Sequence, residues 1–280
     1  MRVLIQSPPF RGYSENNSWH LRGLWPYRWI SGQDMGNPPF VIAYRKKFFL
    51  NQRETIRVHV SADERYKLFL DGCYFGRGSE YGSIDNWYYE TYDMTFEKGN
   101  HVIVAQVWSL GDMAPHAQIS LCHGFIFAPD KMLWDCIGTG TSEWEFKKID
   151  GMEFIPLTSG YLTPYWGTGA NVVIHADKFP WGFEKGEGNG WKPVKILHEG
   201  TNGYLRNGAF PSHLMRPSEL PSQIDQEIKT GIVRYVSKSI DFDLTKTPIH
   251  DFNNVKDEEP LWDLLGNEKS VIIPPKSSRR

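Results

Sequence analysis

Residues 61–78 read SADERYKLFLDGCYFGRG, and this stretch decides the fold class. In Arg65–Leu70, apolar side chains at every second position fall on one face, which is the period of a half-buried β-strand. Asp71-Gly72 then supplies two residues that accept positive φ, as the centre of a type I′ turn requires. Tyr74-Phe75 opens a return strand. The stretch therefore predicts a β-hairpin, and it contains no obvious catalytic group.

Strand patterns continue on both sides of this hairpin. They cover Val41–Leu50, Thr55–Val60, Tyr88–Phe96, His101–Trp108 and Gln118–Ala128. Between the third and the fourth of these lies Glu97–Asn100, whose Gly-Asn pair tolerates left-handed backbone and predicts a second hairpin. Short strands at even spacing, joined by antiparallel turn chemistry, predict an all-β fold of the jelly-roll or β-sandwich kind.

The second half of the chain is less regular. Strands are predicted at Thr141–Lys147, Asn171–Ala176, Lys192–Ile196 and Thr230–Phe242, and a short helical turn at Asp257–Leu265. The loops between the first three are rich in Gly and Trp, and loops of such length usually bind or cap something. Pro211–Pro221 holds three prolines, which predicts an extended crossing between domains.

Charge excludes two classes of partner. The 280 residues include 31 Lys and Arg and 33 Asp and Glu, a net charge of −2. Because positive and negative charges are so nearly balanced, the chain shows no electrostatic footprint for nucleic acid or an anionic membrane. We expect neither partner.

Cysteine and histidine give no framework for a metal or a disulfide core. Cys73, Cys122 and Cys136 are odd in number and lack a CxxC spacing, which argues against a disulfide scaffold and leaves room for one bridge plus a free thiol. The histidines that the sequence draws attention to, at positions 116, 123 and 175, are isolated. We expect no metal site and no cofactor.

The N-terminus carries no export signal. MRVLIQSPPF contains one positive charge and a short apolar trio before Pro8-Pro9, which is too short for a signal-peptide core. No stretch of the sequence approaches the length of a membrane span. A cytoplasmic location is expected if this N-terminus is the native one.

Aromatic residues make up 14% of the chain, with 11 Trp. Sugars present C–H faces that pack on aromatic rings, so this composition fits a protein that handles carbohydrate. Ligand sites combine such rings with a few placed polar groups. The candidates in loops and at a strand entrance are Trp87, Tyr88, Tyr165, Trp166 and Trp181. The competing interpretation is that these rings close the end of a sandwich core.

Carboxylates are plentiful but form no recognisable catalytic pair. An inverting glycosidase needs two carboxyl groups about 6.5–9.5 Å apart. Asp63-Glu64 falls in a strand connection, and Asp93 beside Thr95 is interpreted as a turn-forming pair. There is no GxSxG motif for a serine nucleophile. We expect no catalytic residue in this chain.

The order of several motifs resembles one family. YRKKFFL is followed by VSADERYKLFLDG, then YETYDMT and KGNHVIVAQV, and downstream by TSEWEFK, GNGWKPVKIL and HLMRPSELPSQ. From about Trp29 to the C-terminus this order resembles the N-terminal region of bacterial α-L-rhamnosidases of glycoside hydrolase family 78.

The resemblance implies accessory β-sandwich modules of the galactose-binding-like, jelly-roll kind, placed before an (α/α)₆-barrel catalytic domain. It implies an N-terminal arm over residues 1–24, a jelly roll over 25–215 and a partial second sandwich over 216–280. The barrel, which hydrolyses terminal α-L-rhamnose with inversion in that family, is not matched, and the sequence is interpreted as stopping before it. The missing barrel and a rhamnose-containing glycan are therefore the expected partners.

Two other functions remain open. The chain could be a free-standing carbohydrate-binding module, or a glycosidase that uses loop carboxylates. An open reading frame continuing beyond Arg280 into a helical region favours the accessory role, and a stop codon favours the free-standing module.

Overall fold

The computed structural model describes residues 1–10, 23–80, 82–156, 170–203, 213–222, 224, 240–241 and 277–278. The chain divides into two compact units, Met1–Ser222 and Gln223–Arg280. Within the first unit, the strand β15 (Met215–Pro217) pairs in parallel with β7 (Trp87–Phe96). This strand lies within Pro211–Pro221, the predicted extended crossing, and the domain boundary at Met215 stays a prediction.

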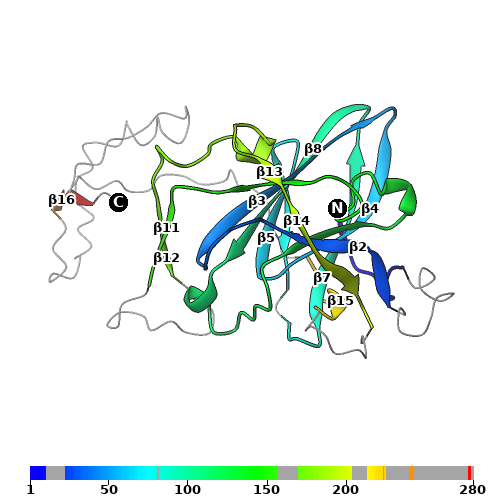
Figure 1. Ribbon diagram of the computed structural model, residues 1–280, viewed down its shortest axis with the longest axis horizontal. Helices are drawn as coiled ribbons and strands as arrows, with labels where there is room; N and C mark the ends of the chain where they lie inside the picture. The colour runs from blue at the N-terminus through cyan, green and yellow to red at the C-terminus, as the bar shows by residue number, and fades with distance from the viewer. Residues whose placement is uncertain are drawn as a thin grey trace, which may run out of the picture. The chain divides into compact units, whose positions relative to one another are not determined.

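The first sheet is mostly antiparallel and contains the strand order β1-β7-β4-β9-β2-β14, with β15 on the other part of β7 (Figure 1). The bounds of its further strands are β1 Arg2–Val3, β2 Leu24–Ser31, β4 Glu54–Ala62, β9 Phe125–Pro129 and β14 Lys195–Thr201. The start of the expected N-terminal arm therefore adds a short strand to this sheet.

The second sheet has the order β13-β10-β3-β8-β5-β6. Its strands are β3 Phe40–Leu50, β5 Arg65–Leu70, β6 Cys73–Gly78, β8 Gly99–Ser109, β10 Glu145–Lys148 and β13 Lys192–Pro193. Two further ladders lie outside both sheets: β11 Met152–Ile155 with β12 Asn171–Ile174, and β16 Ile240–Asp241 with β17 Ser277–Ser278. In the described part of the chain, short 3₁₀ turns connect strands at Gly111–Met113, Met132–Trp134 and Phe183–Lys185.

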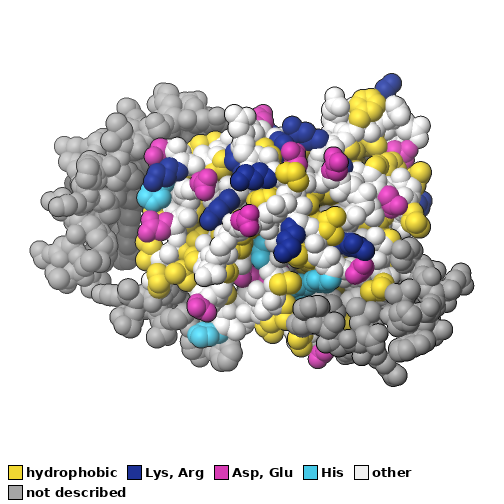
Figure 2. All heavy atoms as spheres, in the orientation of Figure 1, with side chains coloured by type: hydrophobic (Ala, Val, Ile, Leu, Met, Phe, Trp, Pro, Cys, Tyr) yellow, Lys and Arg dark blue, Asp and Glu magenta, His cyan; other side chains and the backbone are white. Residues whose placement is uncertain are grey.

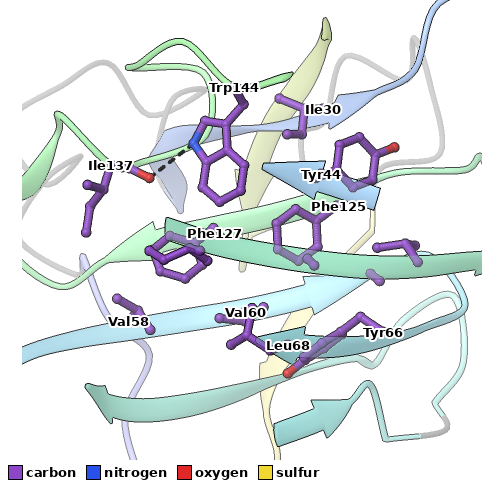
Figure 3. Close-up of a cluster of buried hydrophobic side chains, with 14 of the residues drawn as sticks. Ile30, Tyr44, Val58, Val60, Tyr66, Leu68, Phe125, Phe127, Ile137 and Trp144 are labelled. Carbon is purple, nitrogen blue, oxygen red and sulfur yellow. Dashed lines mark hydrogen bonds between the residues drawn. The ribbon is translucent and has the colours of Figure 1, made fainter. Parts of the chain in front are cut away.

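The core lies between the two sheets (Figure 3). Alternate residues of each strand point inward, and the fully buried ones include Val58 and Val60 from β4, Leu68 from β5 and Phe127 from β9. The indole of Trp144 closes one side of the core and donates a hydrogen bond to the carbonyl of Ile137 (3.1 Å). The prediction of an all-β, two-sheet sandwich is confirmed.

The opening hairpin is confirmed at its turn. Asp71 and Gly72 have φ of 50° and 82°, so both central residues are left-handed as a type I′ turn requires. β5 and β6 pair across this turn, with an irregularity in register after Leu68.

The second predicted hairpin, at Glu97–Asn100, is wrong. β7 pairs with β4 and β1 in the first sheet, whereas β8 lies between β3 and β5 in the second. The turn therefore carries the chain across the sandwich. Gly99 does have positive φ, at 141°, but turn residues alone do not distinguish a hairpin from a crossing between sheets.

The outer faces of both sheets are partly covered. A cluster of aromatic side chains, including Trp25, Tyr27 and Tyr89, covers one end of the first sheet. On the second sheet, Val41, Val104 and Phe183 form a smaller cluster, against which Met152 and Phe154 of β11 pack. Figure 1 shows β11 and β12 as a separate ribbon beside the main sheets.

One buried arginine holds the glycine-rich loop that covers the second sheet. Arg45 in β3 forms an ion pair with Glu145 (2.6 Å) and donates to the carbonyl of Gly186 (2.5 Å). Its guanidinium carbon lies 4.2 Å from the ring centre of Trp191. This loop is thus used to cap a sheet, one of the two roles expected of the long loops.

The structure also differs from the sequence-based prediction in the bounds of several strands. Of the predicted strand Gln118–Ala128 only Phe125–Ala128 is strand, in β9, since residues 120–122 contact a buried carboxylate described below. β2 was not predicted. Of Thr230–Phe242 only Ile240–Asp241 lies within the described residues, and Asp257–Leu265 lies outside them. The partial second sandwich stays a prediction.

Candidate functional site

The crossing from β4 to β5 places two acids at one corner of the sandwich. Asp63 is fully buried, and its carboxylate accepts hydrogen bonds from the backbone N–H groups of Leu121 (2.9 Å) and Cys122 (3.1 Å) and from the hydroxyl of Ser120. The same carboxylate also contacts Nε2 of His213 at 2.8 Å. With four partners, Asp63 is committed to fixing loop 118–122 and β15 to this corner.

His213 extends this network away from Asp63. Its ring is fully buried, stacked on Trp29 with ring centres 4.1 Å apart and edge-on to Trp87 at 4.4 Å. Its Nδ1 lies 3.2 Å from Nε2 of His198. Burial, followed by repulsion from His213, lowers the pKa of His198 to about 4, so that His198 is neutral at pH 7.

Two further acids have strongly raised pKa values. Burial raises the pKa of Glu64 to about 7, even though the backbone N–H of Leu110 donates to it at 2.8 Å. Burial likewise raises the pKa of Glu90 to about 7, against the effect of a hydrogen bond from the hydroxyl of Tyr66 (2.9 Å). Raised carboxyl pKa values are common at catalytic sites, and they also occur in structural networks.

The space beside the corner acids decides between these two roles. A cavity of about 10 Å³ touches Asp63, Glu64, Trp87 and Tyr88. Such a volume holds about one water molecule. A sugar ring is larger than this space, and the contacts of Asp63 and Glu64 hold the neighbouring loops at this corner.

Of the aromatic candidates that the sequence predicted, Trp87 and Tyr88 meet at the small cavity, and Trp181 lies on another loop. Trp87 is 5% exposed, and its indole donates to the carbonyl of Ala62 (3.0 Å). Tyr88 is partly exposed at the small cavity. Trp181 is 68% exposed on a distant loop, where its indole donates to the carbonyl of Ala176 (2.8 Å). Tyr165 and Trp166 lie outside the described residues. The binding role of these residues stays a prediction.

The histidines and cysteines also lie apart. His123 is partly buried, with its Nε2 2.9 Å from the hydroxyl of Tyr44, and this burial lowers its pKa to about 4. His175 lies on the surface beside Glu153. Within the described residues, no three His, Cys, Asp or Glu side chains gather as metal ligands, no helix is long and apolar enough to cross a membrane, and the three cysteines are free.

Sequence reasoning missed an open cleft on the first sheet. The cleft has a volume of about 310 Å³, and its lining consists of Thr55, Arg57, Asp93, Asp130, Lys131 and Trp134. The interpretation of Asp93 and Thr95 as a turn is wrong, since both lie within β7, opposite Arg57 and Thr55 of β4. Polar residues at alternate positions of Thr55–Val60 were the available signal, but the partner strand could not be known.

Comparison with solved structures finds a likeness for most of the chain. It is similar to a rhamnosidase of family GH78 from Bacillus sp. GL1, with a TM-score of 0.54 and 18% identity, over 71% of this chain and 20% of that one. An α-L-rhamnosidase from Dictyoglomus thermophilum gives a TM-score of 0.41 with 12% identity, over 62% of this chain and 21% of that one. A lectin from Pleurotus ostreatus in complex with GalNAc gives 0.38 with 20% identity, over 78% and 49%.

Only the first of these likenesses is close enough to carry an argument, and at this identity it concerns the fold. The predicted resemblance to part of a GH78 rhamnosidase is confirmed in that sense. This chain spans about a fifth of the length of that rhamnosidase. No family model and no curated protein matches the sequence.

Proposed function

We propose that this chain is a non-catalytic, carbohydrate-associated β-sandwich region of an α-L-rhamnosidase-like glycoside hydrolase, whose parent reaction is inverting hydrolysis of terminal α-L-rhamnose. The observation that carries the proposal is the fold likeness to about a fifth of a GH78 rhamnosidase. Fold alone does not give function, so the site chemistry has to agree with it.

The buried acids agree with a non-catalytic role. Asp63 and Glu90 are buried, and each accepts hydrogen bonds from the protein on its carboxylate. A glycosidase needs two carboxyl groups that flank a bond of the substrate in an accessible site. The corner acids have only a water-sized space beside them.

An exposed apolar strand supports a partner domain. In β12, Val172, Val173 and Ile174 are 46%, 36% and 54% exposed. Exposed apolar patches of this kind mark interaction surfaces. In this proposal the occupant is the catalytic barrel of the parent protein, and the expected division into a jelly roll at 25–215 and a partial sandwich at 216–280 belongs to the same proposal.

The test is turnover of an aryl α-L-rhamnoside by the purified 280-residue chain. The proposal expects no release of the aryl group. Turnover that is lost when a carboxylate of this chain is changed to its amide would overturn it.

A second candidate, a free-standing carbohydrate-binding module, is favoured by the open cleft on the first sheet, which needs no other domain to be complete. Reading the gene beyond Arg280 separates the two. A frame that continues into a helical domain supports the accessory region, and a stop codon supports the module.

A further inference from the structure

The cleft on the first sheet has the size of a small-molecule site. Its volume of about 310 Å³ lies at the lower end of the range of about 300–1,000 Å³ that ligand pockets occupy. Its position is separate from the buried corner of Asp63 and Glu64, since no lining residue is shared.

Strand register builds the floor of this cleft. Ile56 and Val58 of β4 point into the core, so Thr55 and Arg57 point out of the sheet. The register sets Arg57 directly opposite Asp93 of β7. Nε and Nη2 of Arg57 donate to the two carboxylate oxygens of Asp93 at 2.7 and 2.8 Å.

This bidentate pair fixes the guanidinium of Arg57 and does not use its Nη1 group as a donor. Among the described residues none accepts a hydrogen bond from Nη1 of Arg57. Thr55 lies two residues before Arg57 on the same face of β4, and its hydroxyl is 2.9 Å from the hydroxyl of Thr95. The N–H groups of this fixed guanidinium that Asp93 does not use lie next to hydroxyl groups, and such a set is suited to binding vicinal oxygens of a ligand.

Asp130 forms one wall. It follows β9, and its backbone N–H donates to the carbonyl of Arg57 (2.8 Å), which holds it beside the floor. Behind it lies His59, which is 1% exposed, with Nε2 3.6 Å from the Asp130 carboxylate and no hydrogen-bond partner. Behind this wall, the buried Nε2 of His59 therefore has no hydrogen bond with Asp130.

Aromatic rings and a hydroxyl group contact His59, and the charges of Arg57 and Asp93 also act on it. Rings of Phe10, Trp25 and Tyr89 pack around it with centres 5.6–6.1 Å away, and its Nδ1 lies 2.9 Å from the hydroxyl of Thr91. Burial lowers its pKa, so that the imidazole is neutral at pH 7. The Asp130 carboxylate, whose pKa is lowered chiefly by its interaction with His59, is ionised.

Trp134 supplies another part of the lining. Its ring is partly exposed, and one side packs against the core cluster between the sheets. The indole is therefore held in place by the protein, as a stacking platform must be. The C–H face of a sugar ring packs on such a surface, while its hydroxyls reach charged groups nearby.

The charges around the cleft cancel. Arg57 and Lys131 contribute two positive charges, and Asp93 and Asp130 two negative ones. Figure 2 shows a similar mixture on one face of the whole molecule, where Lys and Arg are interspersed with Asp and Glu. An anionic or cationic ligand gains nothing from a balanced site, whereas hydroxyl groups can use both its donors and its acceptors.

We propose that this cleft binds a neutral saccharide unit, which stacks on Trp134 and hydrogen-bonds to Asp130 and Arg57. The inference rests on the carbohydrate association proposed above, but it does not depend on a catalytic barrel.

The test is calorimetric titration of the full chain with methyl α-L-rhamnoside and with methyl α-D-galactoside, and with galacturonate as the anionic comparison. Binding of at least one neutral glycoside is expected. Trp134→Ala should weaken it at least tenfold, and Asp130→Asn several-fold. Phe49→Ala is the matched control, since it removes an exposed ring from β3 of the second sheet and should leave the affinity unchanged. Trp181→Ala tests the alternative site that the sequence suggested.

Folding of each variant is checked by thermal unfolding, because Trp134 also packs on the core. Asp130→Asn keeps the side-chain volume and thus tests the cleft even if Trp134→Ala is unstable. If affinity survives Asp130→Asn but is lost in Trp181→Ala, the sugar binds elsewhere and this inference fails while the proposed function stands. If galacturonate alone binds, the neutral ligand is wrong. If no glycoside binds at all, both the inference and the carbohydrate association fail.

Discussion

Glu90→Gln should make the stability of this protein less dependent on pH. Glu90 is 3% exposed, and burial raises the pKa of its carboxyl group to about 7 from its usual 4.5. Hydrogen bonds from Tyr66 and from the backbone N–H of Glu80, together with the charge of Arg2, oppose this shift but do not cancel it.

Linkage between proton binding and folding gives the direction in which stability changes with pH. Because the pKa is higher in the folded state, the folded protein binds the proton more tightly, and stability falls as the pH rises from about 4.5 through about 7. With about 1.4 kcal/mol per pKa unit, the charged carboxylate costs about 1 kcal/mol at pH 5 and about 3 kcal/mol at pH 8. Glu90→Gln removes this charge at both pH values.

The amide can satisfy the same network. Its oxygen accepts from the N–H of Glu80, and its NH₂ group donates to the hydroxyl oxygen of Tyr66. The Tyr66 hydroxyl then donates to Tyr92 at 3.1 Å, and Tyr92 donates to the carbonyl of Arg77 at 3.1 Å. Both groups that donate to Glu90 in the parent therefore keep a hydrogen-bond partner in the variant.

The assay is urea unfolding of the parent and Glu90→Gln at pH 5 and pH 8. The stability difference, variant minus parent, should increase by about 2 kcal/mol between the two pH values. Glu64 titrates in the same range, but it is present in both proteins and cancels from the difference. Glu97→Gln is the control, because Glu97 is exposed in an ion pair with Arg53 and loses the same charge. A difference for Glu90→Gln that is as flat as that for Glu97→Gln would refute the reasoning.

Three further outcomes follow from the structure. Gly72→Val should cost about 1–3 kcal/mol of stability, because φ is 82° there, whereas Asp71→Asn should be nearly neutral; equal melting temperatures for Gly72→Val and the parent would contradict this. Gly78→Ala should also destabilise by about 1–3 kcal/mol, since a Cβ would lie 2.7 Å from the Tyr66 ring and closer still to Glu90, and unchanged thermal unfolding would argue against that packing. Backbone amides of Thr55–Ala62 and His101–Trp108 should exchange slowly with solvent, because they lie in the paired strands β4 and β8, and fast hydrogen exchange there would contradict this pairing.

Local chemistry made the strands and the first turn predictable. Alternation in Arg65–Leu70 and the need for positive φ at Asp71-Gly72 are properties of neighbouring residues, and the structure keeps both. The pairing of β7 was not predictable in this way, because Glu97–Asn100 has the same residues whether it closes a hairpin or crosses between sheets.

The candidate cleft depends on the same non-local information. Arg57 and Asp93 are 36 residues apart and meet through register, and Asp130 reaches them only after β9 has paired with β4. The aromatic rings that composition indicated do not line this cleft. Trp87 has little exposed surface, and Trp181 lies on a separate loop. Composition indicates which side chains suit a sugar, but only the sheet order decides which of them share a site.

The most direct test of the account is one NMR experiment, in which the purified chain is mixed with a rhamnose-terminated oligosaccharide and followed over time. Saturation transfer from protein to sugar reports binding, and the anomeric signals of free L-rhamnose report hydrolysis. A carbohydrate-associated sandwich without an active site should show saturation transfer, reduced by Trp134→Ala, while no free rhamnose accumulates. Free rhamnose that disappears on changing a carboxylate of this chain to its amide would contradict the account, and so would the absence of any saturation transfer.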